Sequence, residues 1–170
     1  ADAVTAHPGL TLTNLPADLL AAIDGMLPPR WSRNNPVDLA AGETRDTIPD
    51  LLELVAGHPG TDSILQLGLG IQGNTAALAR RGPFHPDHGL ERIVDFHERQ
   101  ERRYAEAASE ASARHSKPVL VASELAVTQP ENPMVTAVRE SGRLCYPSAD
   151  RAVAALGHLV RYAAWLKART

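Results

Sequence analysis

The chain has 170 residues, which is enough for one domain or for one domain with an appendage. Hydrophobic residues make up 44% and charged residues 22% of it, as is typical of a globular protein. The formal net charge is −3, and the only basic clusters, Arg80-Arg81 and Arg102-Arg103, stand beside acidic residues. The sequence therefore has no basic footprint for a nucleic acid.

The cellular location can be predicted from three features. The single cysteine, Cys145, excludes an intrachain disulfide, which fits a reducing compartment. No apolar run reaches the roughly 18 residues that cross a bilayer. The first residues do not have the charged and then apolar pattern of a signal peptide. We therefore expect a cytoplasmic protein that makes no membrane contact.

The first 60 residues predict helices around one strand. A short helix over residues 1–6 ends before Pro8. Pro16 suits the first turn of a helix over residues 17–26. The alternating pattern of Val37-Asp38-Leu39 predicts a short strand, and a helix with apolar residues at helical spacing follows it. Either Thr44 or Thr47 can cap that helix, and Gly57 ends it.

The middle of the chain predicts a strand, a turn and two helices. Residues 63–67 form the strand, residues 68–74 a glycine-rich turn, and residues 75–81 a helix. A loop rich in Pro and Gly follows. Residues 90–113 have a long helical pattern that is highly charged. Its apolar stripe is thin, so we expect most of this helix to face water.

The last third predicts two strands and two helices. Residues 118–122 are a continuous apolar run, which is typical of a buried parallel strand. A helix over residues 132–141 and a strand over residues 144–146 follow. Ser148 is the expected N-cap of the final helix. The apolar face of that helix carries Val153, Leu156, Val160 and Ala163.

Strands that alternate with helices predict an α/β fold with an open, mostly parallel sheet and helices on both faces. We expect a single domain over residues 1–170, in which residues 83–115 form a loop and a long charged helix. Ligands of such sheets bind beyond the carboxyl ends of the strands. Four stretches are expected there: residues 38–44, 68–74, 123–124 and 146–148.

The glycine-rich turn is the best candidate for an anion site. Glycines let backbone N–H groups approach a phosphate, and the following helix adds the positive end of its dipole. The predicted phosphate-binding residues are Gly68, Gly70, Ile71, Gln72, Gly73 and Asn74. No Lys-Ser or Lys-Thr follows, and the glycine spacing is not that of a dinucleotide fingerprint. A tight strand-to-helix turn, which also needs glycine, is the alternative interpretation.

Other candidate residues favour structural roles. The seven histidines include His85 and His88, which flank Asp87, but this loop has no second pair of ligands nearby, so we predict no metal site. Cys145 lies in a predicted buried strand, where a free cysteine packs as a small hydrophobe. Ser148 is first a helix cap. Asp38 at a strand end is the carboxylate best placed to face a site, and bonding to loop amides is its alternative role.

One segment resembles a known family. Residues 31–39, with the sequence Trp-Ser-Arg-Asn-Asn-Pro-Val-Asp-Leu, resemble a motif of the NDP- or ADP-forming acyl-CoA synthetases, which include acetate–CoA ligase and are related to succinyl-CoA synthetase. The resemblance continues through most of the chain. Its motif loop comprises Asn35, Pro36, Asp38, Gly42 and Thr44, and further matches are residues 62–65, 117–120, 146–148 and 151–153.

The resemblance implies a flavodoxin-like module that follows the CoA-binding and phosphohistidine domains and precedes an ATP-grasp domain. The implied reaction is acid + CoA + ATP = acyl-CoA + ADP + phosphate, with Mg, ATP or ADP and CoA bound by the full enzyme and none by this chain alone. It also implies that residues 68–74 hold a phosphoryl group at a helix N-terminus. Partners would be the other domains of the same enzyme or a partner subunit, with a homo-oligomer as a further possibility.

The chain departs from the family in several places. No histidine stands in a Ser-His-Thr-Gly setting, and neither an ATP-grasp signature nor the CoA-binding glycine motif is present. The family's first strand of this module would precede residue 1. We therefore expect a sheet that lacks this strand and a chain with no catalytic residue of its own. Two other functions remain open: an anion- or nucleotide-binding regulatory module, and a hydrolase that uses Cys145 or Ser148.

Overall fold

The computed structural model describes residues 1–39 and 44–169. Eleven elements are formed by the described residues. In chain order they are α1 (Asp2–Thr5), α2 (Ala17–Asp24), α3 (Thr47–Gly57), β1 (Ile64–Leu67), α4 (Ile71–Arg80), α5 (Leu90–His115), β2 (Val119–Ala122), α6 (Leu125–Thr128), α7 (Pro133–Glu140), β3 (Cys145–Tyr146) and α8 (Ala149–Lys167). None of these helices is both long enough and apolar enough to cross a membrane.

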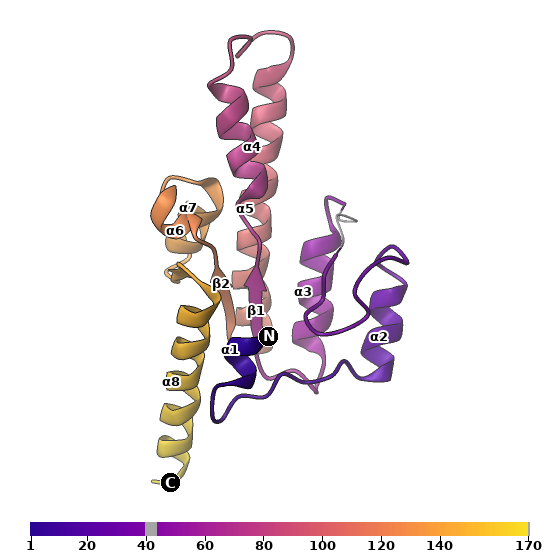
Figure 1. The fold of residues 1–170 in the computed structure, drawn as a ribbon, viewed down its shortest axis with the longest axis vertical. Coiled ribbons are helices and arrows are strands. Elements are labelled where there is room, and N and C mark those ends of the chain that lie inside the picture. The colour runs from indigo at the N-terminus through magenta and orange to yellow at the C-terminus, as the bar shows by residue number, and fades with distance from the viewer. Residues whose placement is uncertain (40–43, 170) are drawn as a thin grey trace.

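The three strands form one parallel sheet in the order β1-β2-β3 (Figure 1). In this sheet Gln66 is paired with Val121, and Val121 is paired with Cys145. The helices between the strands are the crossovers that parallel neighbours require. The predicted fold class, an open parallel α/β sheet consistent with a flavodoxin-like arrangement, is confirmed.

Helices cover both faces of the sheet because side chains alternate along each strand. Val119 and Val121 of β2 point to one face and pack in a cluster with α5 and α7. Leu120 and Ala122 point to the other face and pack with Ala152 and Leu156 of α8. All four residues of β2 are buried, as the continuous apolar run predicts.

The prediction that α5 mostly faces water is wrong. Nine of its residues are buried, and the helix packs against α3, α4, α7 and β2. The reason is its alanines: Ala105, Ala108 and Ala111 are at most 2% exposed. Such small side chains let neighbouring helices approach closely without a stripe of large apolar residues. Apart from the buried Glu101, the charged residues therefore lie on the outer side of a central helix.

A second apolar cluster lies between α2 and α3. Leu19 and Ile23 of α2 pack there with Trp31, which is 3% exposed. The Trp31 indole N–H donates to the Asp24 carboxylate at 2.8 Å. The segment that resembles the ligase motif therefore begins with a residue that anchors α2.

The predicted strand at Val37-Asp38-Leu39 does not form. This segment is irregular and pairs with no strand among the described residues. The Ser32 hydroxyl donates to the Pro36 carbonyl at 2.8 Å and accepts from the Asp38 amide at 3.0 Å, so a local turn takes up these groups. Val37 and Leu39 pack against the α2 cluster instead of entering the sheet.

Three further differences concern the helices α4, α6 and α8. Helix α4 begins at Ile71, four residues before the predicted start, because Gly70 adopts a left-handed conformation and serves as the N-cap. The short helix α6 was not predicted. In α8, Val153 and Leu156 are buried as predicted, but Val160 is 39% exposed. The strands have at most four residues and end before the last turns of this helix, so its residues from His158 onward are exposed in the described structure (Figure 1).

Candidate functional site

Three of the four stretches predicted at the carboxyl edge of the sheet lie there. β1, β2 and β3 are parallel, so the residues after Leu67, Ala122 and Tyr146 come out at the same edge. The fourth stretch does not share this position, since residues 37–39 are outside the sheet and Gly42 lies outside the described residues. The candidate site is therefore built from the start of α4, the start of α6 and the start of α8.

A carboxylate of the chain occupies the N-terminus of α4. The amide of Gly70 donates to Glu101 Oε1 at 2.7 Å. The amides of Gln72 and Gly73 donate to Glu101 Oε2 at 2.9 and 3.2 Å. Glu101 comes from α5 and is 1% exposed. The first turn of α4 thus holds an anion through its free amides and its dipole, and this anion is internal.

Three of the six phosphate-binding residues predicted from the sequence contact this carboxylate. Gly70, Gln72 and Gly73 bond to it directly. The Asn74 amide donates to the Gly70 carbonyl at 2.9 Å in the first turn of the helix. The Asn74 side-chain oxygen accepts a hydrogen bond from Gln129 at 3.1 Å. The side chain of Ile71 is 70% exposed. Phosphate binding at these positions stays a prediction, and a phosphoryl group there would have to replace Glu101.

The glycines of this turn also have structural roles. Gly70 has φ +104°, and a Cβ built there would overlap the side chain of Leu125. A Cβ on Gly73 would lie 2.8 Å from Asn132 Nδ2. Gly68 has φ +79°, but a Cβ there would meet nothing within 4 Å. The close approach of α4 to its neighbours therefore needs glycine whether or not a ligand binds.

Two buried polar side chains fix the position of the turn. Asn132 donates from Nδ2 to the Gly70 carbonyl at 3.1 Å and accepts the Met134 amide at 3.0 Å as the N-cap of α7. The Ser123 hydroxyl donates to the Leu69 carbonyl at 3.2 Å. Asn132 is 3% and Ser123 is 6% exposed. They connect the ends of β1 and β2 to the start of α7.

Sequence reasoning did not find Glu101 or Asn132. Asn132 precedes Pro133, and an N-cap followed by proline is a recognisable helix start. Glu101 lies on the same face of α5 as the buried residues Val94, Ala105 and Ala108. Its burial could therefore be predicted only if these alanines were recognised as part of the core. Its partners come from 28 to 31 residues away, which no local pattern reports.

Neither candidate nucleophile is set up for attack. Burial raises the pKa of the Cys145 thiol above its ordinary value, and its Sγ lies 3.8 Å from Met134 Sδ. The Ser148 hydroxyl accepts the Arg151 amide at 3.3 Å, which confirms its predicted role as the N-cap of α8. In the described part of the chain, no group of three His, Cys, Asp or Glu residues could hold a metal ion.

The motif loop lies apart from these groups. Asn35 donates from Nδ2 to the Thr13 carbonyl at 2.9 Å, and the Thr44 hydroxyl shares a 2.8 Å hydrogen bond with Thr47. The Tyr104 hydroxyl donates to the Thr44 carbonyl at 3.3 Å. Asp38 is exposed. The described motif residues therefore hold the connection between α2 and α3 in place.

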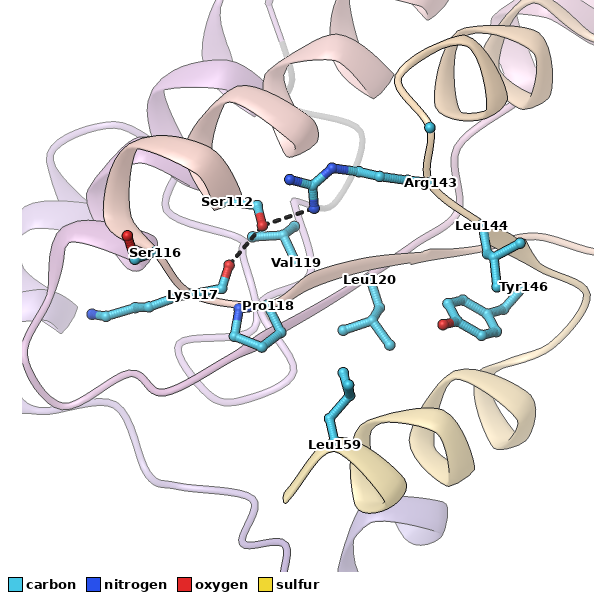
Figure 2. A pocket seen from close by; sticks show the side chains of 11 residues that line it. Ser112, Ser116, Lys117, Pro118, Val119, Leu120, Arg143, Leu144, Tyr146 and Leu159 are labelled. Atoms are coloured by element: carbon cyan, nitrogen blue, oxygen red, sulfur yellow. Dashed lines mark hydrogen bonds between the residues drawn. The ribbon is translucent and has the colours of Figure 1, made fainter. Parts of the chain in front are cut away.

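Two grooves of the described structure are relevant here. The first, of about 440 Å³, adjoins the candidate site and is lined by Gly73, Asn132, three arginines (Arg80, Arg81 and Arg102) and two glutamates (Glu98 and Glu131). The second, of about 490 Å³, lies at the amino ends of β2 and β3, away from Glu101 (Figure 2). Only the first groove could extend the candidate anion site.

Comparisons of the sequence with family models and with curated proteins, and of the structure with solved structures, found no match.

Proposed function

We propose that the chain is the flavodoxin-like module of an NDP-forming acyl-CoA ligase, which catalyses acid + CoA + ATP = acyl-CoA + ADP + phosphate. In this proposal the module does not act alone, and CoA, Mg and ATP or ADP are bound by the complete enzyme in the cytoplasm. The proposal is supported by the motif at residues 31–39, by the further matches along the chain and by the open parallel α/β fold.

The structural observation that carries the proposal is the unpaired edge of β1. Among the described residues, β1 pairs only with β2. The Ile64 amide donates to the Pro118 carbonyl of the neighbouring segment at 2.9 Å. Because successive residues of a strand direct their backbone groups to opposite sides, the N–H and C=O groups of Leu65 and Leu67 point to the open edge. Leu67 is 51% exposed. A flavodoxin-like sheet would have its first strand at this edge, next to the Val37–Leu39 segment that here stays outside the sheet.

In this proposal the start of α4 binds the phosphoryl group. Its amides select an anion, as their bonds to Glu101 illustrate. In the assembled enzyme a phosphoryl group would compete with this carboxylate. Glu101 then acts as an internal substitute that keeps the amides bonded whenever no phosphoryl group is present.

Replacing Leu65 by proline tests whether the open edge of β1 pairs with a further strand. Proline has no N–H, so Leu65→Pro removes a donor from the open edge while the Ile64 and Gln66 amides can still bond to β2. We expect a mixture of the wild-type chain with the CoA-binding, phosphohistidine and ATP-grasp domains, in which the phosphohistidine domain is extended at its C-terminus by the first strand of this module, to form acyl-CoA with ATP. Leu65→Pro should reduce this rate at least about tenfold, which corresponds to about 1.4 kcal/mol.

Leu65→Ala is the matched control, because it removes the same side-chain packing on α8 but keeps the edge N–H. It should retain most of the rate. Circular dichroism of all three chains checks that the module is folded. No ATP-dependent gain on adding the wild-type chain to the other domains would overturn the proposal.

A second function is favoured by the groove beside α4. A regulatory module that binds an anion or a nucleotide without catalysis would use the same amides, together with Arg80, Arg81 and Arg102 in the groove of about 440 Å³. Arg80 and Arg102 are at present bonded to Glu98 and Glu140, at 2.7 and 2.6 Å. An anionic ligand would have to exchange with these exposed ion pairs, which contribute little to stability.

Phosphate titration distinguishes the two functions. For the regulatory module, phosphate or ADP should raise the melting temperature of the isolated wild-type chain in a saturable manner. For the ligase module, the wild-type chain should show no such rise, while Glu101→Ala should show it because its amides are free. Chloride at matched ionic strength is the control for salt. If phosphate leaves Glu101→Ala unaffected, the start of α4 does not hold a phosphoryl group.

A further inference from the structure

The C-terminal half of α8 has an apolar surface that is about half exposed in the described structure. Helix α8 has 19 residues and is about 28 Å long, whereas a four-residue strand spans about 13 Å. Its last turns therefore run on past the sheet (Figure 1). Leu159, Tyr162 and Leu166 are 45% to 59% exposed there. Their spacing of three and four residues places them on one face.

This face continues into the groove at the amino ends of β2 and β3. Figure 2 shows Leu120, Leu144, Tyr146 and Leu159 turned toward one another along this groove. Leu144 is 69% exposed. The surface thus combines a projecting part, which is the end of α8, with a recessed part next to Leu159. An isologous contact between two copies requires both parts in one patch.

We propose that this surface is the contact between two copies of the chain, in which the α8 helices pack antiparallel across a twofold axis near Tyr162 and Ala163. In that register Leu166 of each copy lies against Leu159 of the other. Trp165 of each copy lies at the level of Val160, close to the mouth of the opposite groove. Each copy therefore places Trp165 next to the recessed part of the other copy.

The apolar area available is enough for a weak dimer. Six large apolar side chains are about half exposed on this surface: Leu144, Leu159, Val160, Tyr162, Trp165 and Leu166. At roughly 200 Å² for each aromatic and roughly 100 Å² for each aliphatic side chain, covering their exposed parts removes roughly 400 Å² of apolar surface from each copy. A standard interface buries about 800 Å² on each side. The surrounding polar atoms can supply the remainder.

The charges do not prevent this contact. After Asp150 the sequence contains Arg and Lys residues but no Asp or Glu. Two of them are held along their own helix: Arg161 contacts His158 at 2.6 Å, and the Arg169 guanidinium lies 3.9 Å over the ring of Trp165. Such a contact is apolar with weak repulsion at its margins, so added salt should strengthen it. Binding to an acidic protein or to anionic lipid would instead weaken with salt.

Sedimentation equilibrium of the chain tests the proposal. We expect a monomer–dimer equilibrium in the micromolar range that tightens as NaCl is raised. Leu166→Glu should weaken it at least about tenfold. Leu78→Glu on α4 is the matched control, since Leu78 is 63% exposed but lies on another element, and it should leave the equilibrium unchanged.

The register is tested by cross-linking. With Cys145→Ser as background, Ala163→Cys should give a disulfide-linked dimer on mild oxidation, and Ala154→Cys, an exposed position outside this contact, should not. A wild-type chain that stays monomeric, an open-ended series of oligomers, or a dimer that survives Leu166→Glu would overturn the proposal. So would a monomer that co-sediments with phosphatidylglycerol vesicles through α8.

Discussion

Replacing Glu101 by alanine is expected to lower the free energy of unfolding by about 3 kcal/mol. The Glu101 carboxylate accepts the amides of Gly70, Gln72 and Gly73 at 2.7 to 3.2 Å, and it is 1% exposed. Removing it leaves buried donors at the start of α4 without an acceptor. Each such donor costs about 1 to 3 kcal/mol unless water enters. Urea denaturation at fixed pH measures the change, with an unchanged m value as the check on two-state behaviour.

Two further variants separate charge from shape. Glu101→Gln keeps the size of the side chain but turns an NH₂ group toward the amide donors, and we expect a loss of about 2 kcal/mol. Glu106→Gln is the matched control, because Glu106 is on the same helix, is exposed, and accepts a long hydrogen bond of 3.5 Å from Arg102. It should change stability by less than about 0.5 kcal/mol. Equal losses for Glu101→Gln and Glu106→Gln would contradict the assigned role of Glu101.

The sequence predicts the sheet well because its signals are local. The apolar run of β2 is buried on both faces, and Ser148 caps α8, as expected. The strand predicted at Val37-Asp38-Leu39 fails for a reason that is not local. A strand needs a neighbour, and among the described residues Val37 and Leu39 pack against the α2 cluster and pair with neither edge of the sheet. Alternation of apolar residues predicts an extended segment and cannot supply its partner.

The candidate site was predicted in part. Glycines after a strand mark the start of α4, and this is where three amides converge. What they hold could not be predicted, because Glu101 reaches them from a helix that begins after a long loop. That helix was expected to face water for the same reason: Ala105, Ala108 and Ala111 are weak apolar signals, although they form its buried face. Packing partners far apart in sequence decided both outcomes.

The anion preference of the site follows from the fold and does not require a ligand. Gly70, in a left-handed conformation, ends the loop and begins α4, so that the first amides of the helix point toward the same position. A negative group at this point is stabilised by the amides and by the helix dipole together. An internal carboxylate satisfies this requirement within the isolated chain. The same requirement would favour a phosphoryl group that arrived from another domain.

Replacing Gly70 by alanine is expected to lower the free energy of unfolding by about 3 kcal/mol. Its φ of +104° costs an L-residue about 1 to 2 kcal/mol. The added Cβ would also overlap the side chain of Leu125, and overpacking of this kind costs about 1 to 3 kcal/mol. Urea denaturation measures the total, and near-ultraviolet circular dichroism reports whether the packing around α4 persists.

Gly68→Ala separates the two contributions. Gly68 has φ +79°, yet nothing lies within 4 Å of a Cβ there, so it should lose only the backbone cost of about 1 to 2 kcal/mol. The difference between the two variants then measures the contact with Leu125. Combining Gly70→Ala with Leu125→Ala should recover part of that difference, because the smaller side chain makes room for the new methyl group. If Gly68→Ala and Gly70→Ala lose the same stability, close packing of the turn does not explain why glycine stands at position 70.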